Sequence, residues 1–241
     1  MKEAICVNNL TKTYDGRAVV DHLNLSVKKG TVFGLLGANG AGKSTTIECM
    51  LGTKKADSGA ISLLGQDPGR KRSRLFENIG VQFQEGDYQL EIRVSELCEE
   101  MACLYKNSAD WKELCRRFGI GDKIGNAVKS LSGGERQRLF IVLALIPQPQ
   151  LVFLDELTTG LDARARRCVW KILEELKKQG LTIFLTSHFM DEVEALCDEI
   201  CILKKGRSVF YGTVEEAKKT CSCEKFEEAY LILSDEEENP V

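Results

Sequence analysis

The stretch from Gly37 to Thr45 contains the residues whose types and spacing most directly suggest chemistry. It fits G-x-x-x-x-G-K-[ST], with an apolar run before it and a helix-like run after it. Glycines let the backbone turn its N–H groups toward anionic oxygens, and a helix start adds unpaired donors and a dipole's positive end. In such a phosphate loop Lys43 would reach the β- and γ-phosphates, while the Ser44 hydroxyl would bind Mg²⁺. The stretch predicts that the chain binds a nucleoside triphosphate.

A pair of acids, Asp155 and Glu156, follows the apolar run 151–154. Acids placed there stand at the carboxyl end of a strand, where ligand sites of α/β proteins lie. Asp155 suits a Mg²⁺ shell, and Glu156 could accept a proton from an attacking water. His188 ends the next strand-like segment, so it can reach the same crevice. A solvated Asp-Glu turn is the alternative interpretation of the pair, and the phosphate loop favours the catalytic one.

Residues 131–138 are a third feature, and they lead directly into an apolar, helix-like segment. Ser132 is a suitable N-cap, and Glu135 three positions on gives the spacing of a capping box. Gly133 and Gly134 at the helix start could also present N–H groups to an anion. The residues alone therefore predict either an ordinary helix cap or a second phosphate site.

The order of strand-like and helix-like segments predicts an α/β fold that positions these residues. Alternating short strands and turns over residues 3–36 predict an N-terminal antiparallel β-subdomain. A helical pattern over 94–118 lies between strand-rich parts, so we expect an α-helical subdomain inserted in the α/β core at about 86–147. We predict one domain over residues 1–232 and an acidic, disordered tail at 233–241.

The helical block shows two sets of apolar residues at helical spacing. The sets are Leu97, Met101, Leu104 and Tyr105 on one face, and Trp111, Leu114, Cys115 and Phe118 on another. We expect helices at both.

Tyr14 stands directly before an Asp-Gly turn. An aromatic ring there could stack on a nucleobase, which contributes roughly 1–3 kcal/mol in other systems. A tyrosine that half-covers an edge strand is the alternative, and spacing alone favours it.

Composition limits the classes of protein that the chain can belong to. Of 241 residues, 43% are hydrophobic and 29% are charged, which is ordinary for a globular protein. The net charge of −3 gives no indication of a nucleic-acid surface. The longest apolar run, 139–146, is too short for a membrane span, and the N-terminus lacks the apolar core of a signal peptide. We therefore expect a cytoplasmic location.

Ten cysteines are present, and most have apolar neighbours, which suits small core residues in a reducing compartment. Cys221 and Cys223 form the one tight pair. A metal or redox role is conceivable for them, but no second Cys or His pair is near. A structural or incidental role is the favoured interpretation.

Together these motifs resemble the ATP-binding subunit of an ATP-binding-cassette (ABC) transporter, from about residue 3 to about residue 232. Residues 131–138 look like the signature motif of that family, and Ser132 follows Lys43 by 89 positions, a spacing similar to that of the family. The compact build and the ending 226–231 look like the exporter type that handles drugs and polysaccharides.

The resemblance implies a role for each motif residue. Tyr14 would stack on adenine, which reverses the interpretation from spacing. Gln84 looks like the Q-loop glutamine, Asp155 like the Walker B aspartate, Glu156 like the catalytic glutamate, and His188 like the switch histidine at the γ-phosphate. Catalysis would involve Glu156, His188, Gln84 and Lys43, with Mg²⁺ bound by Ser44, Gln84 and Asp155. ATP would be bound by Tyr14, Asn39, Gly40, Ala41, Gly42, Lys43, Ser44, Thr45, Ser132, Gly133, Gly134 and Asp162.

The resemblance also implies partners. Two cassettes would pair head-to-tail around two ATP molecules and drive transport through a separate integral membrane subunit, at the inner face of the cell membrane. Nucleic acid is not an expected partner. The alternatives are a soluble cassette ATPase acting on the ribosome or DNA, and a nucleotide-sensing regulatory subunit. Glu135, in place of a common glutamine, and Leu157, in place of a common proline, depart from the family pattern without removing a catalytic group.

Overall fold

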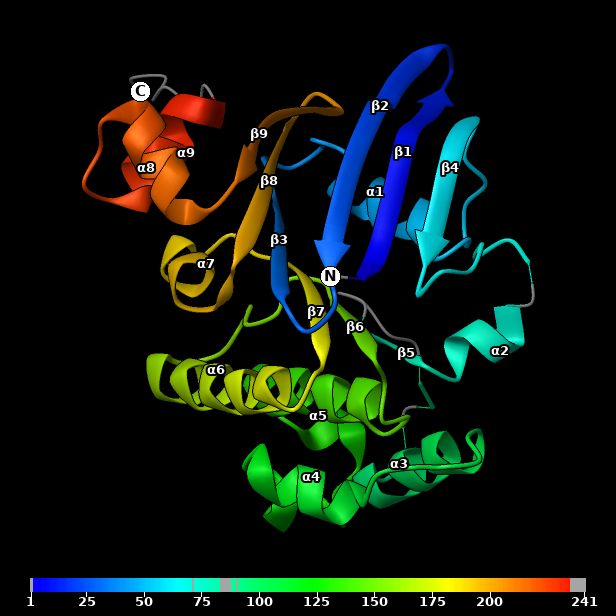
Figure 1. The fold of residues 1–241 in the computed structure, drawn as a ribbon. Helices are drawn as coiled ribbons and strands as arrows, with labels where there is room; N and C mark the ends of the chain where they lie inside the picture. The colour runs from blue at the N-terminus through cyan, green and yellow to red at the C-terminus, as the bar shows by residue number, and fades with distance from the viewer. Residues whose placement is uncertain (1, 71, 83–87, 90, 235–241) are drawn as a thin grey trace. The chain divides into compact units, whose positions relative to one another are not determined.

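The computed structural model describes residues 2–70, 72–82, 88–89 and 91–234. The chain divides into two compact units, whose helices and strands are labelled in Figure 1. Unit 1 consists of Met1–Leu75 and Thr186–Val241, and unit 2 consists of Phe76–Leu185. The predicted helical segment at about 86–147 falls inside unit 2, together with three β-strands.

Unit 1 begins with an antiparallel sheet of β1 (Glu3–Tyr14), β2 (Arg17–Lys28) and β4 (Ser58–Leu63), in the order β2-β1-β4. The alternation of residues in this segment fits strands that bury one face. The turn between β1 and β2 is Asp15-Gly16, and both residues have positive φ, as a tight hairpin requires. The predicted N-terminal antiparallel sheet is confirmed, with longer strands than the sequence pattern indicated.

The second part of unit 1 is built on β3 (Val32–Leu36), which is buried at every residue and pairs in parallel with β8 (Glu199–Lys204). β8 turns back at Lys205-Gly206 into the antiparallel strand β9 (Arg207–Gly212). The helices of this unit are α1 (Lys43–Met50), α7 (Met190–Leu196), α8 (Val214–Cys221) and α9 (Phe226–Ser234), with the short α2 (Arg72–Phe76) at its boundary.

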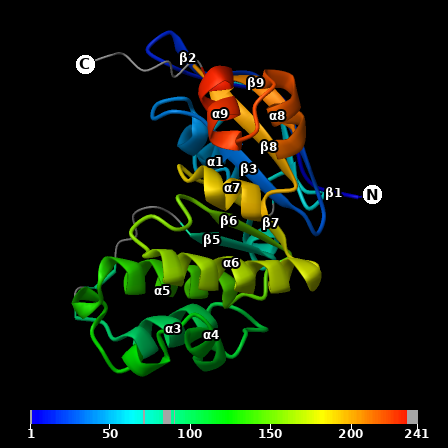
Figure 2. The ribbon, with the colours of Figure 1, turned by 90° about the vertical axis from the view of Figure 1, so that its left-hand side faces the viewer.

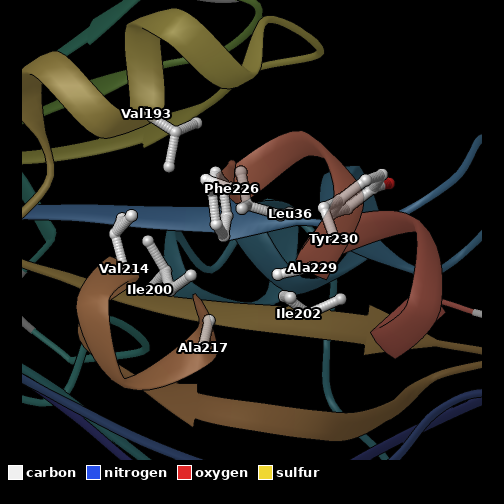
Figure 3. Packing of buried hydrophobic residues seen from close by; sticks show 9 residues of the cluster. All are labelled: Leu36, Val193, Ile200, Ile202, Val214, Ala217, Phe226, Ala229 and Tyr230. Atoms are coloured by element: carbon white, nitrogen blue, oxygen red, sulfur yellow. The ribbon is translucent and has the colours of Figure 1, made fainter. Parts of the chain in front are cut away.

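A hydrophobic cluster joins α7, α8 and α9 to β3 and β8 (Figures 2 and 3). Its members are Leu36, Val193, Ile200, Ile202, Val214, Ala217, Phe226, Ala229 and Tyr230. Leu36 is the last residue of β3, so this cluster supports the strand that leads into the phosphate loop. Burial of the Leu, Val, Ile and Phe side chains of this cluster contributes about 1.5–3 kcal/mol each. Cys221 and Cys223 are partly buried against the same cluster.

Unit 2 contains the parallel strands β5 (Ile79–Gln82), β6 (Leu151–Leu154) and β7 (Thr182–Thr186), with β6 between the other two. Its helices are α3 (Val94–Cys103), α4 (Trp111–Arg117), α5 (Gly133–Leu145) and α6 (Ala163–Lys178), with 3₁₀ turns η1 (Gly121–Lys123) and η2 (Val128–Ser130). α5 lies between the strands and the pair α3 and α4 (Figure 2). Gly80 allows this packing, because a Cβ there would lie 1.9 Å from the Ala144 carbonyl oxygen.

The two apolar faces expected in the helical block differ in burial. On α4 the predicted residues Trp111, Leu114 and Cys115 are buried, as is Phe118 after it. On α3 the buried residues are instead Val94 and Cys98. The predicted set on α3 lies outside the core, with Leu97 and Met101 partly buried and Leu104 74% exposed.

All ten cysteines lie within the described residues, and all are free thiols. Within the same residues, every helix is too short or too polar to cross a bilayer.

Candidate functional site

The phosphate loop of unit 1 connects β3 to α1 through three glycines with positive φ: 143° at Gly37, 78° at Gly40 and 106° at Gly42. A Cβ would lie 2.4 Å from the Leu203 carbonyl oxygen at Gly37 and 2.5 Å from the Val19 carbonyl oxygen at Gly42. At Gly40 a Cβ would meet nothing within 4 Å. The glycines therefore allow close packing beneath the loop and leave its other side open for a ligand.

Lys43 and Ser44 begin the helix that follows the loop. The Lys43 ammonium donates hydrogen bonds to the carbonyl oxygens of Gly37 (2.6 Å) and Ala38 (3.1 Å), so it arches back over the loop. Ser44 itself is exposed. The N–H groups at the start of α1, the ammonium and an exposed hydroxyl form a donor set that suits phosphate oxygens and a hard cation.

A cavity of about 540 Å³ adjoins the phosphate loop within unit 1. Its lining includes the loop residues 38–41 and the basic side chains Arg17, Lys204 and Lys205. Basic groups beside a glycine loop raise the local positive potential, which favours an anionic ligand. The residues present therefore fit a nucleoside triphosphate.

Tyr14 and His188 also belong to unit 1. Tyr14 ends β1 and is 39% exposed. His188 follows β7 and is exposed, at a turn in which the Ser187 hydroxyl accepts a hydrogen bond from the Phe189 N–H (3.0 Å). Each residue is thus presented at the end of a strand, as the sequence indicated.

Unit 2 carries the predicted acidic pair at the end of β6. Asp155 is 9% exposed, and its N–H donates to the Gln82 carbonyl oxygen, at 3.1 Å. The Gln82 amide donates in return to the Asp155 carbonyl oxygen, also at 3.1 Å. Glu156 has φ of 52°, a left-handed conformation that is uncommon for a residue with a side chain. The end of β5 therefore holds the backbone from which both carboxylates project.

Gln137 on α5 contacts the same turn. Its side-chain amide donates hydrogen bonds to the carbonyl oxygens of Glu156 (3.0 Å) and Leu157 (2.9 Å). Leu157, which departs from the family pattern, is fully buried. The helix that begins at the signature stretch thus fixes the turn that follows the acidic pair.

The start of α5 has the capping box that the sequence predicted. Ser132 N–H donates to the Glu135 carboxylate (2.8 Å), and Glu135 N–H donates to the Ser132 hydroxyl (3.3 Å). The hydrogen bond from the Ser132 backbone lowers the pKa of Glu135. A Cβ at Gly134 would lie 3.2 Å from both the Gly160 carbonyl oxygen and the Leu161 side chain, so the signature stretch packs against segment 158–162.

Asp162 ends that segment and caps α6, because its carboxylate accepts a hydrogen bond from the Ala165 N–H (2.8 Å). The Thr159 hydroxyl lies 3.4 Å from the Glu156 carboxylate. Unit 2 therefore brings together the signature stretch, the acidic pair and Asp162. The predicted Gln84 lies outside the described residues.

Sequence reasoning missed two residues that position the acidic pair, Gln82 and Gln137. Each is a polar side chain next to a motif, Gln82 inside a buried strand and Gln137 on the signature helix. A buried glutamine in an apolar strand needs hydrogen-bond partners, which was a signal available in the sequence.

Comparison with known proteins decides the family. The profile of the ABC transporter family matches residues 20–159, more than half of the chain. The chain belongs to the ABC transporter family. It is 38% identical over 220 residues to the Nod factor export ATP-binding protein I of Ralstonia nicotianae, a match that covers 88% of this chain and 68% of that protein. It is 37% identical over 224 residues to the daunorubicin/doxorubicin resistance ATP-binding protein of Streptomyces peucetius, a match that covers 90% of this chain and 67% of that protein.

Solved structures agree with this assignment. The structure described as the ATP binding subunit of an ABC transporter matches with a TM-score of 0.88 and 27% identity, over 96% of this chain and 99% of that one. A nucleotide-free ATP-binding cassette matches with a TM-score of 0.82 and 23% identity, over 95% of this chain and 99% of that one. This second match supports the fold. The predicted α/β phosphate-loop fold is confirmed, and so is the resemblance to the ATP-binding subunit of an ABC transporter.

Proposed function

We propose that this chain is the ATP-hydrolysing subunit of an exporter, in which two cassettes dimerise around two ATP molecules and act on a separate membrane subunit. The observation that carries the proposal is the phosphate loop, with its three left-handed glycines and its inward-turned Lys43. The direction of transport follows from the relatives, whose names describe Nod factor export and drug resistance.

In this proposal the loop N–H groups and Lys43 bind the phosphates of ATP. Ser44, Asp155 and Gln84 would hold Mg²⁺, which neutralises charge on the β- and γ-phosphates. Glu156 accepts the proton of the attacking water, and His188 binds the γ-phosphate. Tyr14 stacks on the adenine.

The signature stretch acts on the second ATP. We propose that Ser132, Gly133 and Gly134 of one chain close over ATP held by the phosphate loop of the other, together with Asp162. The capped start of α5 supports this role, because a helix start combines unpaired N–H donors with a positive dipole end. Its packing against Gly160 would transmit closure to the turn that carries Glu156.

We further propose that α3 binds the membrane subunit. Leu97, Met101 and Leu104 line a shallow groove of about 600 Å³, which also includes Glu96, Glu99 and Glu100. An apolar surface bordered by carboxylates suits an amphipathic helix with basic residues. The apolar character of Tyr88 and Leu90, just before α3, makes both further candidates for contact with the membrane subunit. Leu90 lies outside the described residues, and the Tyr88 hydroxyl accepts a hydrogen bond from Arg136 of α5 at 3.1 Å.

Nucleotide binding and turnover test the proposed function. The purified chain should bind ATP with Mg²⁺, and Lys43→Ala should lose binding or hydrolysis while its unfolding transition stays in place, because Lys43 faces the loop rather than the core. Unchanged ATP turnover in this variant would remove the phosphate loop from the mechanism.

The α3 proposal has its own test. Leu104→Glu should abolish co-purification with the membrane subunit and leave basal ATP turnover unchanged. Val209→Glu is the control, because Val209 is another exposed hydrophobic residue, 42% accessible, on β9 of unit 1. Equal retention of the partner by both variants would show that the docking surface lies elsewhere.

A further inference from the structure

The tip of the β1–β2 hairpin presents the Tyr14 ring beside two lysines. The Lys12 ammonium lies 5.2 Å from the ring centroid, and the Lys54 ammonium lies 5.6 Å from it. Lys54 in turn pairs with Glu48 on α1, at 2.8 Å. Because α1 starts at the phosphate loop, these contacts relate the tyrosine ring to the helix that would hold the phosphates.

The main-chain ladder does not extend to this tip on the β4 side. The last pair between β1 and β4 is Thr11 with Ser58, whereas β1 continues to Tyr14. The pairing of β1 with β2 is also irregular here, with register shifts on both sides of Lys12. Residues 12–14 thus pair with β2 alone, through Val20, Ala18 and Arg17, and a contact from the β4 side would fix them further.

Asp57, the residue before β4, supplies that contact. One carboxylate oxygen accepts hydrogen bonds from the N–H and the hydroxyl of Thr13, both at 2.6 Å. The other oxygen accepts from the Lys12 ammonium at 3.0 Å. The Asp57 N–H donates to the Thr11 carbonyl oxygen at 2.9 Å. One residue thus holds three successive positions of β1 immediately before Tyr14.

Charge supports the same arrangement. The Thr13 hydroxyl, the Thr13 N–H and the Lys12 ammonium lower the pKa of Asp57 to about 2. The carboxylate is therefore ionised at neutral pH, which is the state that accepts from all three donors.

We propose that Asp57 is a positioning residue for Tyr14, and that it sets the affinity of the site for the base of a nucleoside triphosphate. Asp57 fixes the backbone before Tyr14 and holds Lys12 beside the ring, so that the ring is preorganised for stacking. This inference rests on the proposed function, in which Tyr14 receives the base. It concerns the base alone, because the phosphates bind at a loop that Asp57 does not contact.

The experiment compares ATP with inorganic tripolyphosphate, which has the phosphates and lacks the base. Asp57→Asn keeps the shape of the side chain and removes its charge. It should weaken ATP binding about tenfold and leave tripolyphosphate binding unchanged, since only stacking is lost. In steady-state kinetics KM for ATP should rise while kcat stays at the value of the unmodified chain.

Two further variants sharpen the result. Thr13→Val removes one donor to Asp57 and should give the same pattern, ATP weakened and tripolyphosphate unchanged, to a smaller extent. Asp67→Asn is the matched control, because Asp67 is an exposed carboxylate of unit 1 that accepts from the Gly69 N–H (2.8 Å). In the background of Tyr14→Ala, Asp57→Asn should cause no additional loss.

Equal loss of both ligands in Asp57→Asn, or a full additional loss on top of Tyr14→Ala, would overturn the inference and leave the proposed function standing. If the unmodified chain binds neither ATP nor tripolyphosphate, the proposed function fails first and the inference with it.

Discussion

Replacement of Gln137 by alanine should show how the signature helix controls the catalytic turn. The side-chain amide donates at 3.0 Å and 2.9 Å to the carbonyl oxygens of Glu156 and Leu157. Glu156 has φ of 52°, and a left-handed conformation costs a residue with a side chain about 1 kcal/mol or more. We expect the two hydrogen bonds to offset this strain and to orient the Glu156 carboxylate.

The size of the effect follows from the two contacts. Each hydrogen bond contributes about 0.5–1.5 kcal/mol net, so Gln137→Ala should lower the free energy of unfolding by about 1–3 kcal/mol. It should also lower kcat about ten- to hundredfold through misplacement of Glu156. Affinity for ATP should change little, because the phosphate loop belongs to the other unit.

Urea unfolding followed by tryptophan fluorescence is a suitable assay, since both tryptophans, Trp111 and Trp170, lie in unit 2. Gln150→Ala is the control, because the Gln150 amide makes one exposed hydrogen bond to Asn78, at 3.0 Å. If Gln137→Ala matches this control in both midpoint and kcat, the hydrogen bonds from α5 do not hold the turn.

Three further predictions concern hydrolysis, packing and thiol chemistry. Glu156→Gln should retain ATP and form an ATP-dependent dimer on size-exclusion chromatography. It should hydrolyse ATP at least about a hundredfold more slowly, which is the order of magnitude for loss of a general base, and hydrolysis at the normal rate would refute the role of Glu156. Gly80→Ala should lower the free energy of unfolding by about 3 kcal/mol or prevent folding, because its Cβ would overlap the Ala144 carbonyl of α5, whereas Gly125→Ala, with nothing within 4 Å of the added Cβ, should be nearly neutral in the same urea titration. A maleimide at pH 7 should modify the exposed Cys103 and Cys168 and spare the buried Cys98, Cys115 and Cys201 until urea unfolds the chain, and mass spectrometry of the labelled peptides gives the order of labelling. Burial raises the pKa of Cys201 to about 11, so its thiol stays protonated and unreactive.

The sequence by itself determined the local features of this protein. The phosphate loop could be identified because left-handed glycines, the strand before them and the helix after them are adjacent in the chain. The turn at Asp15-Gly16 and the capping box at Ser132 were predicted for the same reason. In each case the residues that decide the structure lie within a few positions of one another, where propensity and hydrogen bonding act directly.

Tertiary structure alone decided which side chains meet across the chain. Asp57 contacts Thr13 over 44 positions and Gln137 contacts Glu156 over 19, and no spacing rule connects such pairs. On α3 the sequence predicted one apolar face that includes Leu104, but the position of the neighbouring helices left Leu104 exposed and buried Val94 and Cys98. Periodicity shows which residues share a helix face, whereas burial depends on the surface that packs against that face, and that surface comes from distant parts of the chain.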